Sequence, residues 1–177
     1  MEACKMKILR RWSLILVLMI GILCCTQKST SRFKANSEPD GFGGIKWGTE
    51  FSEAKSDMVE SRSIANPTEP DVKIKIFYTR KGDNLKMGEA QIDKIEYGFW
   101  KGKFAEGYIT STGSENFNQL KKFLFEKYGT VDKSAQGLYS WNGPVTRIAL
   151  RYDEPTKTSL LTISSTTITF KEIFDKD

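Results

Sequence analysis

Residues 92–110 read IDKIEYGFWKGKFAEGYIT, and this stretch decides the fold. Two runs with apolar side chains at alternate positions flank the short segment Lys101-Gly102-Lys103. Such alternation is typical of a β-strand with one buried face, and a glycine in a tight connection is typical of a hairpin turn. We therefore expect strands at residues 92–100 and 104–110, with a shared buried face on the first strand formed by Ile95, Tyr97 and Phe99.

Further strands are expected on both sides of this hairpin. Residues 72–78 alternate apolar and cationic side chains, and residues 145–152 and 158–164 alternate again around a turn at 153–155. Shorter strands are expected at 85–90 and 138–141. Tight turns between consecutive strands favour antiparallel pairing.

Helical spacing is clearest after the hairpin. Phe117, Leu120, Leu124 and Tyr128 recur at intervals of three and four, with Ser114 expected as the N-cap and Gly129 as the closing residue. A first helix is expected to begin after an N-cap at Ser52 and to end near Ser61. Residues 168–174 are expected to form a last helical turn, with a further strand as the alternative. The predicted fold class is α+β: a two-layer sandwich with helices on one face of an antiparallel sheet, compatible with two helix-plus-strands units.

An export signal precedes this domain. Lys5, Lys7, Arg10 and Arg11 lead into an apolar run, residues 14–23, that stops at Cys24-Cys25. The run is too short for a hydrocarbon core about 30 Å thick, and its basic head is typical of a cleaved signal peptide. We expect residues 1–24 to be removed, whether translation begins at Met1 or at Met6.

The end of the signal, Ile22-Leu23-Cys24-Cys25, resembles the lipobox of bacterial lipoproteins. The resemblance implies that Cys25 is acylated and anchors the chain in a membrane of the bacterial cell envelope, facing the periplasm or the exterior. Modification of Cys24, ordinary secretion and a retained anchor remain alternatives, and the inner and outer membranes are not distinguished. Residues 25–40 contain one large apolar side chain, Phe33, so we expect a flexible tether there and a single domain at 41–177.

Composition excludes several functional classes. The chain has a net charge of +5, but residues 1–24 hold four of its 27 Lys and Arg and one of its 22 Asp and Glu, which leaves +2. This near balance gives no electrostatic drive toward nucleic acid, so no nucleic-acid partner is expected. The chain has no histidine, and its three cysteines are Cys4, Cys24 and Cys25. Without the usual ligands and proton shuttles, we expect no metal site and no cofactor.

One set of residues imitates the motifs of penicillin-recognising enzymes: Ser52-x-x-Lys55, Ser114-Glu115-Asn116 and Lys157-Thr158. The domain is too short for that fold, and N-capping already explains both serines. Asp83-Asn84 and Asp153-Glu154 lie in turns without the spacing of a calcium loop. We therefore expect no catalytic residues.

The candidate binding residues lie at the hairpin tip. Trp100 is expected on the face opposite Phe99, beside Lys101 and Lys103, so an exposed aromatic ring flanked by lysines could bind a partner protein, glycan or lipid headgroup. Core packing is the alternative for the ring. A basic stripe would form as well if the strands that carry Lys73, Lys75, Arg147 and Arg151 were neighbours.

Gly48-Thr49 before the first expected helix and Tyr128-Gly129 at the end of the second resemble small envelope lipoproteins with a β-lactamase-inhibitor-protein-like fold. The hypothesis is a non-catalytic envelope lipoprotein that acts as a binding, assembly or structural accessory module. Its expected partners are the membrane, through the lipid anchor, and an envelope protein. A secreted inhibitor-like or ligand-binding protein is the alternative, and a carboxylate-based hydrolase the third.

Replacing Cys25 with alanine should abolish incorporation of a fatty-acid probe in the expressing bacterium, whereas Cys24→Ala should retain the label. In-gel detection of the probe measures this. The reverse pattern would move the modified residue to Cys24, and an unlabelled wild type would contradict the lipoprotein hypothesis.

Overall fold

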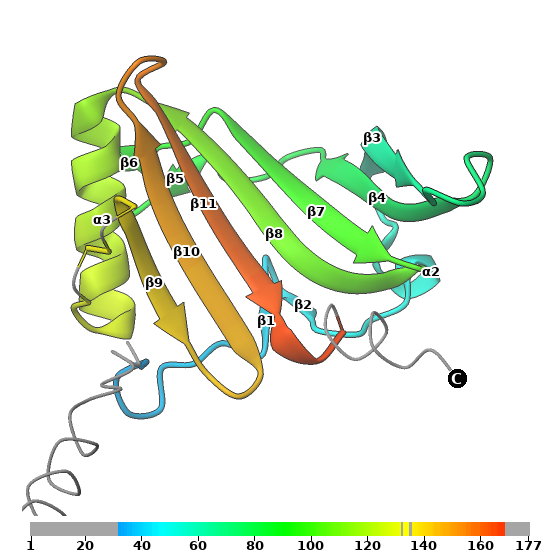
Figure 1. Cartoon of the computed structure of the whole chain (residues 1–177), viewed down its shortest axis with the longest axis horizontal. Coiled ribbons are helices and arrows are strands. Elements are labelled where there is room, and N and C mark those ends of the chain that lie inside the picture. The colour runs from blue at the N-terminus through cyan, green and yellow to red at the C-terminus, as the bar shows by residue number, and fades with distance from the viewer. Residues whose placement is uncertain (1–31, 132, 135, 169–177) are drawn as a thin grey trace, which may run out of the picture. The chain divides into compact units, whose positions relative to one another are not determined.

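The computed structural model describes residues 32–168 except 132 and 135. Its main feature is a seven-stranded antiparallel sheet with the order β3-β4-β7-β8-β11-β10-β9, which Figure 1 shows beside the helix α3. Two small sheets, β1-β2 and β5-β6, each have two strands. An antiparallel sheet combined with helices agrees with the expected α+β class.

The expected hairpin is confirmed and lies in the middle of the sheet. β7 (Lys94–Trp100) pairs with β8 (Lys103–Thr112), and the connection is the pair Lys101-Gly102. Both residues have positive φ, 46° and 83°, as a two-residue turn of the type I′ class requires. Ile95, Tyr97 and Phe99 share the buried face, with at most 8% of any of them exposed.

The strands around the hairpin also follow the expected pattern. β4 (Lys73–Arg80) pairs with β7, and β11 (Thr158–Ser165) pairs with β8. β10 (Thr146–Asp153) and β9 (Leu138–Asn142) complete that side. The short strand expected at 85–90 is instead two strands, β5 (Lys86–Met87) and β6 (Ala90–Gln91), which pair with each other outside the main sheet.

The helix α3 (Ser114–Tyr128) packs through its apolar stripe onto the buried face of the sheet. Leu120 and Leu124 are fully buried, Tyr128 nearly so, and Phe117 is partly buried. The expected N-cap was wrong by one residue, because the helix begins immediately after Gly113 and Ser114 is already in its first turn. Gly129 follows the helix with φ 94°, consistent with the positive φ expected there.

The first expected helix is wrong for most of its length. α2 (Phe51–Ala54) has only four residues, its N-cap is Glu50 rather than Ser52, and β3 (Met58–Ala65) occupies the remainder. Asp57 has φ 60°, a left-handed conformation that a continuing helix does not permit. Phe51, Ala54 and Met58 do contact the core, as their spacing indicated, but Met58 does so from a strand.

The segment expected as a tether contacts the domain well before residue 41. The Phe33 ring meets Tyr128 edge-on at 5.6 Å, and the Lys34 amide donates to the Tyr128 carbonyl at 2.9 Å. Glu38 accepts hydrogen bonds from the amides of Val145 and Thr146 at 2.8 and 2.7 Å. The ordered domain therefore includes residues 33–40, because these side chains find partners on α3 and β10 that composition could not reveal.

β1 (Gly41–Phe42) and β2 (Ile45–Lys46) follow this segment and lead into α2. The Trp47 ring stacks on Phe104 at 5.1 Å and donates a hydrogen bond to Thr146 Oγ1 at 2.7 Å. The helical turn expected at 168–174 lies outside the described residues except for Ile168. The expected signal peptide and Cys25 also lie outside them. Within the described part of the chain, no helix is long and apolar enough to cross a membrane.

Leu124→Ala should lower the free energy of unfolding by about 2–5 kcal/mol, because the fully buried side chain would leave a cavity between α3 and the sheet. Urea unfolding of the mature chain measures this, with Lys122→Ala as the exposed control on the same helix. A loss below about 1 kcal/mol would contradict the packing described for Leu124.

Candidate functional site

The strand residues of the main sheet point to two different faces. Ile109, Ile148, Leu150 and Leu161 lie on the face against α3 and are fully buried. Their neighbours along each strand lie on the opposite face, where most are half-buried or exposed. We call this second face the open face. The candidate site is built on it.

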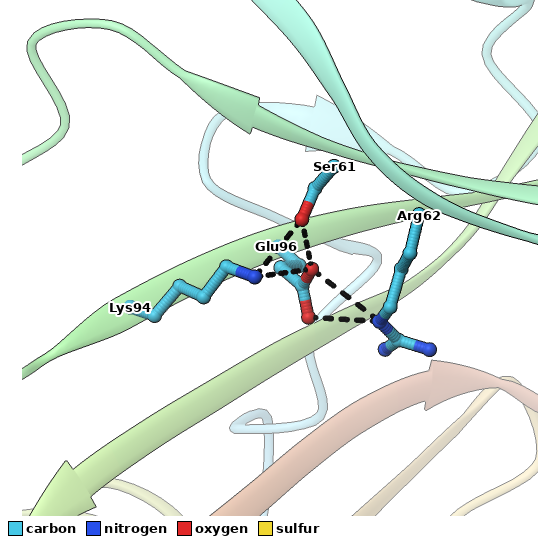
Figure 2. A network of polar contacts seen from close by, with 4 residues as sticks. All are labelled: Ser61, Arg62, Lys94 and Glu96. Carbon is cyan, nitrogen blue, oxygen red and sulfur yellow. Dashed lines mark hydrogen bonds and ion pairs between the residues drawn. The ribbon is translucent and has the colours of Figure 1, made fainter.

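A network of polar contacts around Glu96 lies on the open face beside β3, and Figure 2 shows its four residues. Ser61 Oγ donates to Glu96 Oε1 at 2.6 Å, and Lys94 Nζ donates to the same oxygen at 2.8 Å. Arg62 Nε donates to Oε2 at 3.2 Å. The Glu96 side chain is only 5% exposed, whereas those of Arg62 and Lys94 are 40% and 45% exposed. A buried carboxylate thus binds cations that themselves reach solvent.

These contacts determine the ionisation of Glu96. Burial alone would raise the pKa of Glu96, but the hydrogen bonds from Lys94, Ser61 and Arg62 outweigh it and hold the pKa below its ordinary value. The carboxylate therefore remains ionised at neutral pH. This arrangement suits an anchor for β3 and Arg62 better than a general acid or base.

Arg62 lies across the open face. Its guanidinium carbon lies 3.5 Å above the centroid of the Phe77 ring and 5.0 Å from that of Tyr108. The Phe77 ring packs closely over Gly98 of β7. A Cβ at Gly98 would be 3.0 Å from this ring, so a larger residue there would crowd it. Glu106 Oε2 and Lys75 Nζ, 2.7 Å apart, make a second half-enclosed ion pair on this face.

The structure places the three predicted binding residues at the β7–β8 turn. Lys101 and Lys103 are exposed, but Trp100 is half-buried rather than fully exposed. Trp100 lies directly opposite Lys75 of β4 on one side and Lys103 on the other. Ile64 of β3 lies opposite Lys75 in turn, so one row across four strands joins Ile64, Lys75, Trp100 and Lys103.

Sequence reasoning missed the contribution of β3 to this surface, because its first residues, up to Ser61, were assigned to a helix and residues 62–65 to no element. Three large apolar side chains are exposed on the β3–β4 hairpin: Val59 at 64%, Ile64 at 45% and Val72 at 45%. The β-branched residues Val59 and Ile64 were the available signal for a strand. The Glu96 network was missed for the same reason, since Ser61 and Arg62 belong to β3.

The two strands that carry the cations of the expected basic stripe are not neighbours in the sheet. β4, which carries Lys73 and Lys75, is separated from β10, which carries Arg147 and Arg151, by β7, β8 and β11. Lys73 and Lys75 are also paired, with Glu60 and Glu106 respectively. Lys75, Arg147 and Arg151 nevertheless lie on the open face, whereas a register irregularity separates Lys73 from Lys75 and Lys73 pairs with Glu60.

A second polar network lies at the β4–β5 loop. Arg80 donates to Asp83 Oδ1 and to the Tyr97 hydroxyl, at 2.8 and 2.7 Å, and the Tyr97 hydroxyl donates to Asp83 Oδ1 at 2.9 Å. Burial, followed by the Asp83 charge, raises the pKa of Tyr97, so its hydroxyl stays protonated. The Arg80 guanidinium also donates to the Gly43 carbonyl at 3.0 Å. The network joins the loop to the segment between β1 and β2.

The first of the three serine and lysine motifs does not converge with the other two. Phe51, beside Ser52, donates through its amide to the Gly102 carbonyl, whereas Lys157 accepts at its carbonyl from the Gly113 amide. Gly102 and Gly113 flank opposite ends of the ten-residue strand β8, about 36 Å apart along an extended strand. Among the described residues, no group of three or more His, Cys, Asp or Glu could hold a metal ion.

A surface hollow of about 820 Å³ lies between residues 32–38 and the β9–β10 turn.

Comparisons with protein-family models, curated proteins and solved structures found no match. The candidate site therefore depends on its own geometry.

Glu96→Gln should lower the free energy of unfolding at pH 7 by about 1.5–3 kcal/mol, because hydrogen bonds to a buried carboxylate are lost. The pKa of Glu96 is lowered by folding, so its stabilisation is complete above the unfolded pKa and is lost as the pH falls through the folded pKa. Urea unfolding should therefore show the difference from wild type shrinking below about pH 4.5.

Glu126→Gln is the control, because that side chain is 66% exposed. A difference between wild type and Glu96→Gln that does not change from pH 7 to pH 3 would contradict the assigned ionisation.

Proposed function

We propose that this protein is a non-catalytic lipoprotein of the bacterial cell envelope, anchored through Cys25, whose domain acts as a binding or assembly accessory module. The lipobox resemblance and the basic, apolar signal support the anchor and the envelope location. A two-layer α+β sandwich with its helices on one face is the arrangement we propose for the whole domain.

One observation supports recognition in preference to catalysis: the enclosed carboxylates of the domain are held against cations. Glu96 binds Lys94 and Arg62, Glu106 binds Lys75, and Asp83 binds Arg80. A general acid needs a pKa near the working pH and a route to substrate, and the lowered pKa of Glu96 moves it away from that role. This weighs against the carboxylate-based hydrolase.

The proposed partner-binding surface is the row Ile64, Trp100 and Lys103 together with Lys101. In this row the half-buried Trp100 ring lies between Lys75 and the exposed Lys103, with the exposed Ile64 beyond Lys75, and such a mixture of apolar and cationic side chains suits a partner-binding patch. A secreted protein with the same surface but without the anchor is the alternative, and the fatty-acid labelling of Cys25 distinguishes the two.

Replacing Trp100, Lys101 and Lys103 together with alanine should remove capture of envelope components by the lipidated protein. Since Trp100 is half-buried, the same change should cost about 1 kcal/mol of folding stability. Crosslinking in cells followed by mass spectrometry measures capture, and urea unfolding measures stability. The matched control is Lys55→Ala with Lys122→Ala, two exposed lysines away from this row. Unchanged capture by a folded triple variant would exclude the row as the binding surface.

A further inference from the structure

The exposed charges at strand positions of the open face are all positive. They belong to Arg62, Lys94, Lys103, Arg147 and Arg151. The carboxylates at strand positions of this face are already engaged: Glu96 and Glu106 are in ion pairs, and Asp153 accepts hydrogen bonds from Thr156 in its own turn. Residues 25–177 carry a net charge of only +2, so positive charge is concentrated here. Charge complementarity calls for an anionic ligand.

The cations are spread across most of the sheet. Arg62 lies on β3 and Arg147 and Arg151 lie on β10, with β4, β7, β8 and β11 between them. At about 4.8 Å per strand, these positions span about 24 Å. A single small anion could not contact both ends, so the ligand must be extended and carry several negative charges.

The centre of the open face offers hydroxyl groups. Tyr108 and Thr162 are directly opposite each other on β8 and β11, and Ser164 lies opposite Glu106 one row away. These three side chains are half-buried rather than enclosed, so their hydroxyls can be reached by a ligand. Hydroxyls that donate and accept beside an aromatic ring suit the many hydroxyl groups of a sugar chain. An acidic peptide would leave most of this hydrogen-bonding capacity unused.

Arg62 is positioned to receive an anionic group of such a chain. Its Nε donates to Glu96 and its guanidinium stacks on Phe77, so the side chain is held before any ligand arrives. In Figure 2 the two terminal nitrogens point away from Glu96. A guanidinium presented by this edge can bind a carboxylate or phosphate through two parallel hydrogen bonds.

We propose that the open face binds an extended acidic polysaccharide, with Arg62 and the Arg147–Arg151 pair contacting its anionic groups and Tyr108, Thr162 and Ser164 contacting its hydroxyls. This inference rests on the proposed binding function and names the class of ligand. Polygalacturonate is the probe, neutral dextran tests the need for charge, and poly-L-glutamate tests an acidic polypeptide as occupant. Binding is measured by calorimetry with the purified full chain in detergent micelles.

Polygalacturonate should bind more tightly than either control polymer, and its affinity should fall as salt is raised. Arg147→Gln with Arg151→Gln should weaken it at least tenfold. Thr162→Val with Ser164→Ala should weaken polygalacturonate binding several-fold and leave any poly-L-glutamate binding unchanged, a pattern that simple charge attraction does not produce. Lys55→Gln with Lys122→Gln, off the open face, should change affinity less than twofold. Circular dichroism and urea midpoints show that the variants are folded.

Equal or tighter binding of poly-L-glutamate, equal binding of dextran, or no binding at millimolar sugar units would overturn the ligand assignment. This assay is independent of lipidation and of any captured partner. Polysaccharide binding by a chain that fails to incorporate the fatty-acid probe would therefore contradict only the anchoring part of the proposed function.

Discussion

The antiparallel ladder between β7 and β8 is the interaction on which the rest of the structure depends. The free edge of β7 pairs with β4, and the free edge of β8 pairs with β11. Both halves of the sheet therefore extend from this ladder. The chain before the sheet is attached to the same ladder, because the Gly48 amide donates to the Phe104 carbonyl and the Phe51 amide to the Gly102 carbonyl. A one-residue slip in this register would exchange the two faces of the hairpin.

The register of β7 gives the molecule its two chemical faces. Ile95, Tyr97 and Phe99 enter the core with α3, whereas Glu96 and Trp100 alternate with them on the open face. The side against α3 is apolar and supplies most of the stabilisation. On the open face, carboxylates are neutralised within the fold while several cations remain exposed, so a nearly neutral protein acquires a cationic surface.

Local patterns in the sequence predicted the sheet well where the paired strands follow each other closely in the chain. The alternation in residues 92–110 and 145–164 and the stripe from Phe117 to Tyr128 all led to the correct elements. The same reasoning failed between Ser52 and Ser61, because Phe51, Ala54 and Met58 have helical spacing. Their side chains reach the core, but Asp57 turns the backbone and β4 provides hydrogen-bonding partners for a strand. Pairing with β4 therefore outweighed local spacing.

By itself, the sequence determined the lack of histidine and the central hairpin with Trp100 at its tip, and it carries the prediction of an export signal with lipid attachment at Cys25. These properties depend on residue type and on short spacings, which a linear chain shows directly. Only the tertiary structure decided that Arg62 reaches Glu96, that Ile64 joins the row of Trp100, and that Lys75 and Arg151 share one face although their strands are not neighbours. Such contacts join residues distant in sequence, and they arise because strand order and sheet register bring these residues onto one surface.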